Sequence, residues 1–139
     1  MPCVFCDIIR GTSPSHVIYQ DEKFLAILDK YPIAIGHTLV LPKKHFERAK
    51  DMSQEDFCSL YARVHALNTW IIERLGAQGA HLSINDGAAA NQLIPHLHVH
   101  IIPRSENDNA GFTARKLLQP EQMQEIHKKL QVESLQLVC

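Results

Sequence analysis

The sequence predicts an α+β fold, with a five-stranded, mostly antiparallel sheet, one long helix and shorter N- and C-terminal helices. Two neighbouring apolar runs joined by a short polar turn are typical of a β-hairpin. A later stretch repeats apolar residues at three-and-four spacing, which is typical of an amphipathic helix. Near residue 100, histidine and aliphatic residues alternate as they do in a half-buried strand. The length of 139 residues accommodates one domain of ordinary size, over residues 1–139.

The first third of the chain predicts a short helix followed by three strands. Val4, Phe5 and Ile8 recur at helical spacing, and Gly11 is a helix stop signal. Residues 16–20 and 24–29 are apolar-rich runs on either side of a polar turn, so we expect a hairpin there. A third strand is expected over residues 38–41, after the loop YPIAIG, whose proline and glycine disfavour regular structure.

The remainder of the chain predicts the long helix, two more strands and a last helix. Ser53 is a typical N-cap, and apolar residues then repeat at helical spacing until Gly76. Strands are expected over residues 80–85 and 96–103, joined by the loop DGAAANQLIP. The last helix is expected to start near Pro120, a favourable first-turn residue, with one apolar face formed by Met123, Ile126 and Leu130.

The composition is that of an ordinary soluble protein. Apolar residues make up 45% of the chain and charged residues 21%, and the formal net charge is -1. This charge disfavours a nucleic-acid polymer as partner, because binding to a phosphate backbone needs a basic excess. No apolar run approaches the roughly 18 residues of a membrane helix, and the first residues do not resemble a signal peptide. We therefore expect a cytoplasmic protein without membrane contact, whose four cysteines are thiols or metal ligands.

Histidine is the unusual residue of this sequence. There are nine, and three of them alternate with aliphatic residues between positions 96 and 100. Alternate side chains of a strand share one face, so His96, His98 and His100 are expected to project together. A single histidine on such a strand would most simply be structural. Three aligned imidazoles instead favour a functional site, since they offer a metal ligand, a nucleophile and a proton donor near neutral pH.

The segment HLHVHII resembles the signature of the histidine-triad (HIT) nucleotide hydrolases and transferases, His-φ-His-φ-His-φ-φ with φ apolar. The resemblance extends to CVFCDII near the N-terminus, to a strand ending in Asp29, and to GHTLVLPKKH at residues 36–45. It also includes Asn85 and Gln92, and it spans residues 3–104 in the order typical of the family. The two cysteines indicate the bacterial, zinc-containing branch.

The resemblance implies a nucleotidyl-transfer mechanism. His98 matches the nucleophile, which would attack the α-phosphorus and form a nucleotidyl-histidine that water then hydrolyses. His100 and His37 match histidines near the phosphate and the leaving group. Asn85 and Gln92 match polar residues that face the same phosphate, where hydrogen bonds stabilise the charge of the transition state.

The resemblance also implies where the rest of a nucleotide would lie. Asp29 matches the carboxylate that accepts the ribose hydroxyls. The nucleobase slot would be lined by four apolar residues that spacing alone equally assigns to the core: Val4, Phe5, Ile8 and Ile27. The implied ligand is a purine nucleotide or nucleotide conjugate, although an apolar slot accepts any flat base. The relatives also imply a homodimer.

A second implied site is a structural zinc site. In the zinc-containing branch, the metal is bound by residues matching Cys3, Cys6, His45 and His96. Two thiolates and two imidazoles suit tetrahedral zinc and leave no open position for catalysis. From the residues alone, Cys3 and Cys6 could instead be free buried thiols or a redox pair.

Two positions depart from the family pattern. Asn91 stands where the family often has glycine, and asparagine can still adopt the left-handed conformation. Leu93 stands where Ser or Thr is common, and leucine offers no side-chain hydrogen bond. The expected activity is hydrolysis of nucleoside phosphoramidates or dinucleoside polyphosphates. Two alternatives remain open: a nucleotide-binding module with little turnover, and a metal-dependent hydrolase with His96, His98 and His100 as ligands.

Overall fold

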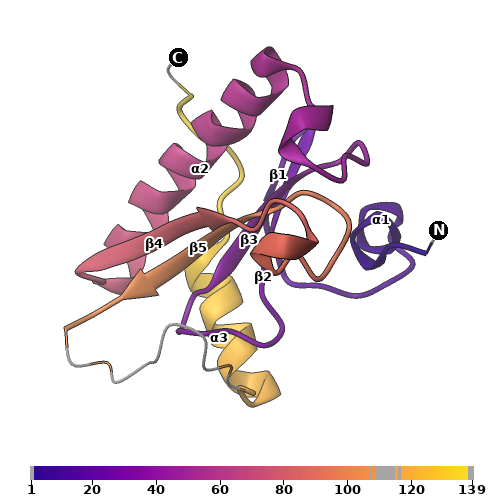
Figure 1. The fold of residues 1–139 in the computed structure, drawn as a ribbon. Coiled ribbons are helices and arrows are strands. Elements are labelled where there is room, and N and C mark those ends of the chain that lie inside the picture. Colours follow the sequence, from indigo (N-terminus) through magenta and orange to yellow (C-terminus); the bar gives the residue numbers. More distant parts are fainter. Residues whose placement is uncertain (1, 107, 109–114, 116, 138–139) are drawn as a thin grey trace.

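The computed structural model describes residues 2–106, 108, 115 and 117–137 (Figure 1). Two short 3-10 turns, Ala49–Asp51 and Ala88–Ala90, lie in loops and were not predicted. The main elements in chain order are α1 (Val4–Arg10), β1 (Val17–Gln20), β2 (Phe24–Leu28), β3 (Thr38–Pro42), α2 (Gln54–Leu75), β4 (Gly79–Ile84), β5 (Val99–Arg104) and α3 (Pro120–Leu130).

The five strands form one sheet in the order β1-β2-β3-β5-β4. Every neighbouring pair is antiparallel. The predicted α+β fold class is therefore confirmed. In the middle of the sheet, Leu39 of β3 is opposite His100 of β5, so the histidine-rich segment lies beside the most buried strands.

The two faces of the sheet carry different helices (Figure 1). On one face, Ala26, Val40 and Val99 belong to the main core with apolar residues of α2 and α3. On the other face, Leu25 and Ile27 pack with residues of α1. This alternation along β2 explains why all five of its residues are buried. The histidines of the triad project toward α1, since Leu97 and Val99 between them belong to the α2 face.

The helix ends follow local chemistry. Cys3 caps α1 and Ser53 caps α2, each accepting a hydrogen bond from a backbone N–H of the first turn. Gly11 and Gly76 end these helices in the left-handed conformation, as predicted. α3 begins at Pro120. Each of these boundaries depends on residues within one turn, which is why the sequence predicted them.

β5 starts at Val99, so the prediction of a strand from His96 was wrong at its beginning. The ladder ends there: β4 ends at Ile84, opposite Val99, and β3 pairs with β5 only as far as Val40, which is also opposite Val99. Leu97 N donates to Phe46 O over 2.7 Å, and His96 Nε2 lies 2.8 Å from Pro42 O at the end of β3. The segment 96–98 is thus held by the end of β3 and the loop after it, and its side chains retain the predicted alternation.

The other strand boundaries differ from the predicted ones by at most one residue at each end. Asp29, for example, falls outside β2 because its Oδ1 accepts the backbone N–H of Tyr31 and starts a turn. None of the helices in the described part of the chain combines the length and apolar composition that crossing a membrane requires.

Candidate active site and metal centre

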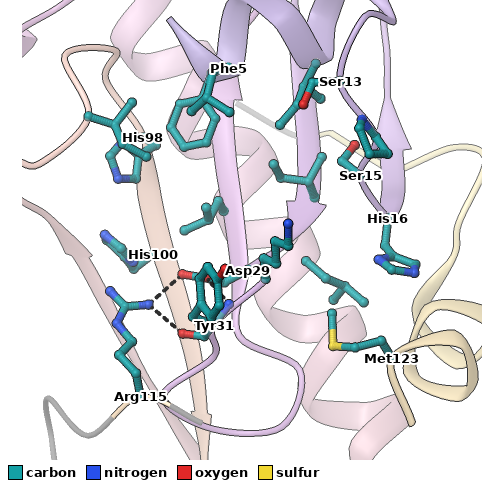
Figure 2. Close-up of a pocket in the computed structure, with 18 of the residues that line it drawn as sticks. Phe5, Ser13, Ser15, His16, Asp29, Tyr31, His98, His100, Arg115 and Met123 are labelled. Atoms are coloured by element: carbon teal, nitrogen blue, oxygen red, sulfur yellow. Dashed lines mark hydrogen bonds and ion pairs between the residues drawn. The ribbon is translucent and has the colours of Figure 1, made fainter. Parts of the chain in front are cut away.

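A cavity of about 1010 Å³ opens on the α1 face of the sheet (Figure 2). His98, His100 and Asp29 provide polar groups on its wall. The apolar residues proposed for the nucleobase slot also line it: Val4, Phe5, Ile8 and Ile27. The structure therefore brings the predicted nucleophile, ribose carboxylate and base slot into one pocket. Pockets of this size hold drug-sized ligands, with a few polar groups that orient them.

The His98 ring has one nitrogen fixed by the backbone. Its Nδ1 lies 2.8 Å from the carbonyl oxygen of His96, and because a carbonyl can only accept, Nδ1 carries the proton. In the neutral ring, Nε2 then carries a lone pair. Phe5 packs edge-on against this ring, with 5.0 Å between ring centroids. The ring is thus oriented by a hydrogen bond and by a pocket-lining aromatic residue, with an unprotonated nitrogen available to attack.

His37 and His100 form a chain of hydrogen bonds. Ile33 N donates to His37 Nδ1 over 3.0 Å, so the proton of neutral His37 is on Nε2. His37 Nε2 lies 2.9 Å from His100 Nδ1 and donates to it. His100 must then carry its own proton on Nε2, a buried atom without a partner in the described residues. A buried N–H left unpaired in a ligand pocket is a donor prepared for an oxygen of the ligand.

Burial keeps these imidazoles neutral. Desolvation lowers the pKa of His37 to about 4 and that of His100 to about 3, and neighbouring histidines add to the effect at His100. The pKa of His98 is also lowered, again mainly by desolvation, while the hydrogen bond to the His96 carbonyl opposes the shift. At neutral pH, His98 Nε2 is therefore a free base and His100 a neutral donor.

Asp29 has a partner that the sequence analysis missed. Arg115 Nη1 donates to Asp29 Oδ2 over 2.7 Å and to the carbonyl oxygen of Tyr31 over 2.9 Å. Arg115 also lines the pocket, as Figure 2 shows. It lies 86 residues from Asp29 in the sequence, outside any motif, so no local pattern could have identified it.

Asn85 lines the pocket, but Gln92 does not. The Gln92 side chain is occupied by backbone groups: Oε1 accepts from Gly87 N over 2.8 Å, and Nε2 donates to Glu47 O over 2.7 Å. These contacts hold the turn that contains Asn91, which adopts the left-handed conformation with φ 66°, one that asparagine can adopt in place of glycine. In this structure Gln92 shapes the loop, and a phosphate contact by Gln92 stays a prediction.

Leu93 lies at the rim of the pocket and is 87% exposed. Its side chain is therefore not part of the core. The departure from Ser or Thr affects the surface that a leaving group would meet, and it has no evident structural role.

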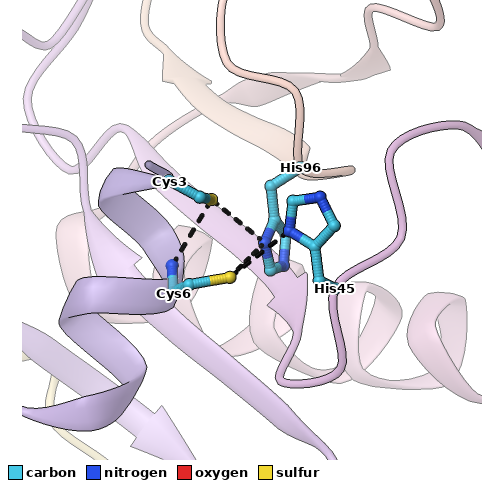
Figure 3. Close-up of side chains that lie close together, drawn as sticks. All are labelled: Cys3, Cys6, His45 and His96. Carbon is cyan, nitrogen blue, oxygen red and sulfur yellow. Dashed lines mark hydrogen bonds between the residues drawn. The ribbon is translucent and has the colours of Figure 1, made fainter. Parts of the chain in front are cut away.

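The second cluster consists of Cys3, Cys6, His45 and His96 (Figure 3). His96 Nδ1 lies 3.5 Å from Cys3 Sγ and 3.6 Å from Cys6 Sγ, and His45 Nδ1 lies 3.3 Å from Cys6 Sγ. With Zn–S of about 2.3 Å and Zn–N of about 2.0–2.1 Å, a tetrahedral zinc separates sulfur and nitrogen ligands by about 3.6 Å. The three sulfur–nitrogen distances therefore suit a tetrahedral zinc ion, and all four ligand atoms lie within 4.8 Å of one another.

Hydrogen bonding prepares His96 for this role. Its Nε2 donates to the Pro42 carbonyl oxygen over 2.8 Å, so the Nδ1 lone pair points at the two sulfur atoms. A backbone carbonyl on the second ring nitrogen is the usual support of a metal-bound histidine. Burial and the neighbouring Cys3 raise the pKa of the Cys6 thiol, so metal binding would have to displace its proton.

The described residues do not bring His96, His98 and His100 to one point. The ligand atoms that could share a metal there form two groups, the Cys/His cluster and Asp29 with His37 and His100. The second group suits a metal poorly, because the lone pair of His37 is taken by Ile33 N–H. The structure thus gives no support to a metal-dependent hydrolase built on the three triad histidines.

Comparison with known proteins identifies the family of this chain. Residues 10–107 match the HIT domain. An uncharacterised HIT-like protein of Methanocaldococcus jannaschii is 43% identical over 106 residues, which are 76% of this chain and 81% of that protein. Adenylylsulfatase HINT3 of Arabidopsis thaliana is 41% identical over 106 residues, and this chain spans 54% of its length.

Solved structures of similar proteins share the fold. A histidine triad nucleotide-binding protein of Sulfolobus tokodaii has a TM-score of 0.85 at 41% identity, with 92% of this chain and 89% of that chain covered. A zinc-bound histidine triad family protein of Mycobacterium smegmatis has a TM-score of 0.81 at 38% identity, with 94% of each chain covered. Sequence, fold and the arrangement of the histidines all lead to one conclusion: this chain belongs to the HIT domain family.

Proposed function

We propose that this protein hydrolyses nucleotide conjugates at the α-phosphate through a covalent nucleotidyl-His98 intermediate. The observation that carries the proposal is the His98 ring, whose Nδ1 proton is held by the His96 carbonyl while Nε2 remains a free base in the pocket. A neutral imidazole needs no separate base before it attacks phosphorus.

In the first step, the His98 Nε2 lone pair forms a bond to the α-phosphorus, and the bond to the leaving group breaks with its electron pair. In the second step, a water oxygen attacks the phosphorus, the P–N bond returns its electrons to Nε2, and the water proton passes to solvent. The His100 Nε2–H can donate to a phosphate oxygen as negative charge develops. Asp29 would accept the ribose hydroxyls, and the base would lie against Phe5 and Ile27.

Zinc would be held by Cys3, Cys6, His45 and His96, and it would supply structural cross-linking. It would tie the start of α1 to the segment preceding β5. Phe5 lies in α1 between the two cysteines and packs against both His96 and His98. The Cys/His cluster would therefore help to orient the nucleophile without touching the substrate.

The substrates we propose are nucleoside phosphoramidates, dinucleoside polyphosphates and, by similarity to HINT3, adenylyl sulfate. The second candidate is a nucleotide-binding protein with little turnover. Leu93 favours this alternative, because the exposed side chain at the rim offers no hydrogen bond to a phosphate or leaving group.

A single-turnover experiment separates the two. Excess enzyme is mixed with labelled adenosine conjugates, quenched in denaturant, and assayed for protein-bound nucleotide and released AMP. The hydrolase predicts a transient acid-labile adduct that is lost in His98→Ala. Tight nucleotide binding without adduct or AMP would establish the binding protein instead.

We further propose a cytoplasmic homodimer, in keeping with the expectations from the sequence. β4 is an edge strand of the sheet, and its Leu82 is 44% exposed. Sedimentation equilibrium of the purified chain tests the dimer, and a monomer at micromolar concentration would contradict it.

A further inference from the structure

Arg115 is a cation on the wall of the pocket that holds His98 and His100, and the mechanism above does not use it. Its Nη1 makes both hydrogen bonds, to Asp29 and to the Tyr31 carbonyl. Within the described residues, Nη2 and Nε have no hydrogen-bond partner, and the side chain is 44% exposed. The guanidinium is thus anchored at one nitrogen while its other donors face the pocket. An anchored guanidinium with free donors is suited to an anionic oxygen of a ligand.

The position of Arg115 relative to His98 indicates which part of a substrate would carry this anionic oxygen. Figure 2 shows His98, His100 and Arg115 one after another along the same side of the pocket. Asp29 Oδ2, which accepts from Arg115, lies 3.5 Å from His37 Nε2, and that nitrogen lies 2.9 Å from His100 Nδ1, so the guanidinium lies near the His100 ring. In an in-line displacement, the leaving group departs from the side of phosphorus opposite the nucleophile. A group displaced by His98 therefore moves past His100 toward Arg115.

We propose that Arg115 is a specificity-determining residue that selects conjugates whose leaving group is an anion. The preferred class is a nucleoside 5′-monophosphate joined through an anhydride oxygen to a second oxyacid, such as sulfate or phosphate. The proposal rests on the function proposed above and narrows its substrate class.

Leu93, which lines the same pocket, agrees with this selection if the leaving group meets the rim there. When an amine leaves a phosphoramidate, the P–N bond breaks and the nitrogen needs a proton. When sulfate or phosphate leaves, the P–O bond breaks and the bridging oxygen keeps the electron pair as an anion, without a proton. Leu93 at the rim cannot donate a proton or a hydrogen bond, whereas Arg115 stabilises the anion.

The experiment compares Arg115→Gln, Arg115→Lys and the parent on two adenosine conjugates, adenosine 5′-phosphosulfate and adenosine 5′-phosphoramidate. Lys128→Gln on the exposed face of α3 is the matched control, because it removes the same charge away from the pocket. Arg115→Gln should lower kcat/KM for the phosphosulfate by about 10- to 100-fold, below the full effect of a buried donor because the side chain is half exposed. For the phosphoramidate the fall in kcat/KM should be several-fold smaller, because that substrate loses only what the contact between Arg115 and Asp29 contributes to ribose binding. Arg115→Lys should recover part of the loss for the phosphosulfate.

Binding provides a readout that does not depend on turnover. The dissociation constants of ADP and AMP are measured by calorimetry for the parent and Arg115→Gln, with the ADP β-phosphate in the place of an anionic leaving group. The preference for ADP over AMP should fall by about tenfold in the variant, as expected for loss of one charge-assisted hydrogen bond.

Equal losses for both conjugates would overturn the proposal and assign Arg115 to holding Asp29. An unchanged ADP-to-AMP preference would overturn it as well. If the parent turns over neither conjugate but the binding preference depends on Arg115, the hydrolase function fails while anion recognition by Arg115 stands.

Discussion

The Cys/His cluster and the triad pocket use histidines from one short segment for different purposes. His96 is fully buried among two sulfur atoms and a second imidazole, whereas His98 and His100 lie two and four residues further on, at an open cavity. Residue type and burial are nearly the same for all three. The difference lies in the partner of the second ring nitrogen.

The hydrogen-bond partner of one ring nitrogen determines whether the other nitrogen offers a lone pair or a proton. In His96 the Pro42 carbonyl takes the Nε2 proton and leaves the Nδ1 lone pair for a metal. In His98 the His96 carbonyl takes the Nδ1 proton and leaves the Nε2 lone pair for phosphorus. In His100 the Nδ1 lone pair is used by His37, which leaves a donor. Three hydrogen bonds thus suit one residue type to the three proposed roles of metal ligand, nucleophile and oxyanion donor.

The largest expected effect tests whether His98 alone is the nucleophile. His98→Ala should reduce turnover by about a million-fold, as loss of a covalent nucleophile does, while nucleotide affinity stays within about tenfold. Single-turnover assays and calorimetry measure the two quantities. His65→Ala, at an exposed position of α2, is the control. Turnover close to that of the parent would remove His98 from this role.

The second prediction concerns the donor chain. His100→Ala should slow turnover by about 100- to 1,000-fold, the cost of losing one transition-state donor. Because His37 acts through His100, the double variant His37→Ala, His100→Ala should be little slower than His100→Ala alone. Losses that multiply in the double variant would mean that His37 contacts the substrate independently.

The third prediction addresses the Cys/His cluster. Cys6→Ser should lower the zinc content from about one per chain, and the melting temperature should fall by about 10 °C as the metal's folding energy is lost. Turnover per folded molecule should change by less than about tenfold, since no ligand of this cluster acts on the substrate. Cys58→Ser, on the exposed side of α2, should change none of these. Elemental analysis without zinc in the parent would contradict the assignment.

The fourth prediction concerns Leu93→Ser at the rim of the pocket. A hydroxyl donor there should raise phosphoramidate turnover by at most about a hundredfold and affect affinity less, because the donor acts when the leaving atom needs it. Stability should not change, since Leu93 is exposed. Leu137→Ser, at an exposed position outside the pocket, is the control. An unchanged rate in a stable variant would show that position 93 is remote from the chemistry.

The smallest expected effect is on stability in acid. His37 and His100 have pKa values of about 4 and about 3 in the folded protein, below the ordinary value near 6.5, so the unfolded chain binds more protons in this range. The free energy of unfolding should therefore rise as the pH increases from about 4 to about 6.5, and then level off. Urea titrations across this range measure it. His100→Asn should flatten the slope, and an unchanged slope would contradict the burial of a neutral His100.

Some features were determined by the sequence alone, because they depend on neighbours within a few residues. The helix ends at Gly11 and Gly76, the left-handed Asn91 and the alternation of the histidines belong to this group. Each follows from backbone sterics or from the period of a strand or helix. The family signature added the Cys/His cluster, which the structure assembles at distances that suit zinc.

Other features were decided only by the tertiary structure, because they are contacts between residues far apart in the chain. The role of each ring nitrogen depends on carbonyls and imidazoles that the fold brings near, such as Pro42 beside His96. Two other contacts are of the same kind: the hydrogen bond from Gln92 to the Glu47 carbonyl, and the pairing of Arg115 with Asp29. Spacing in a sequence encodes which face a side chain occupies. Hydrogen-bond partners across the fold determine which atom of that side chain is free to react.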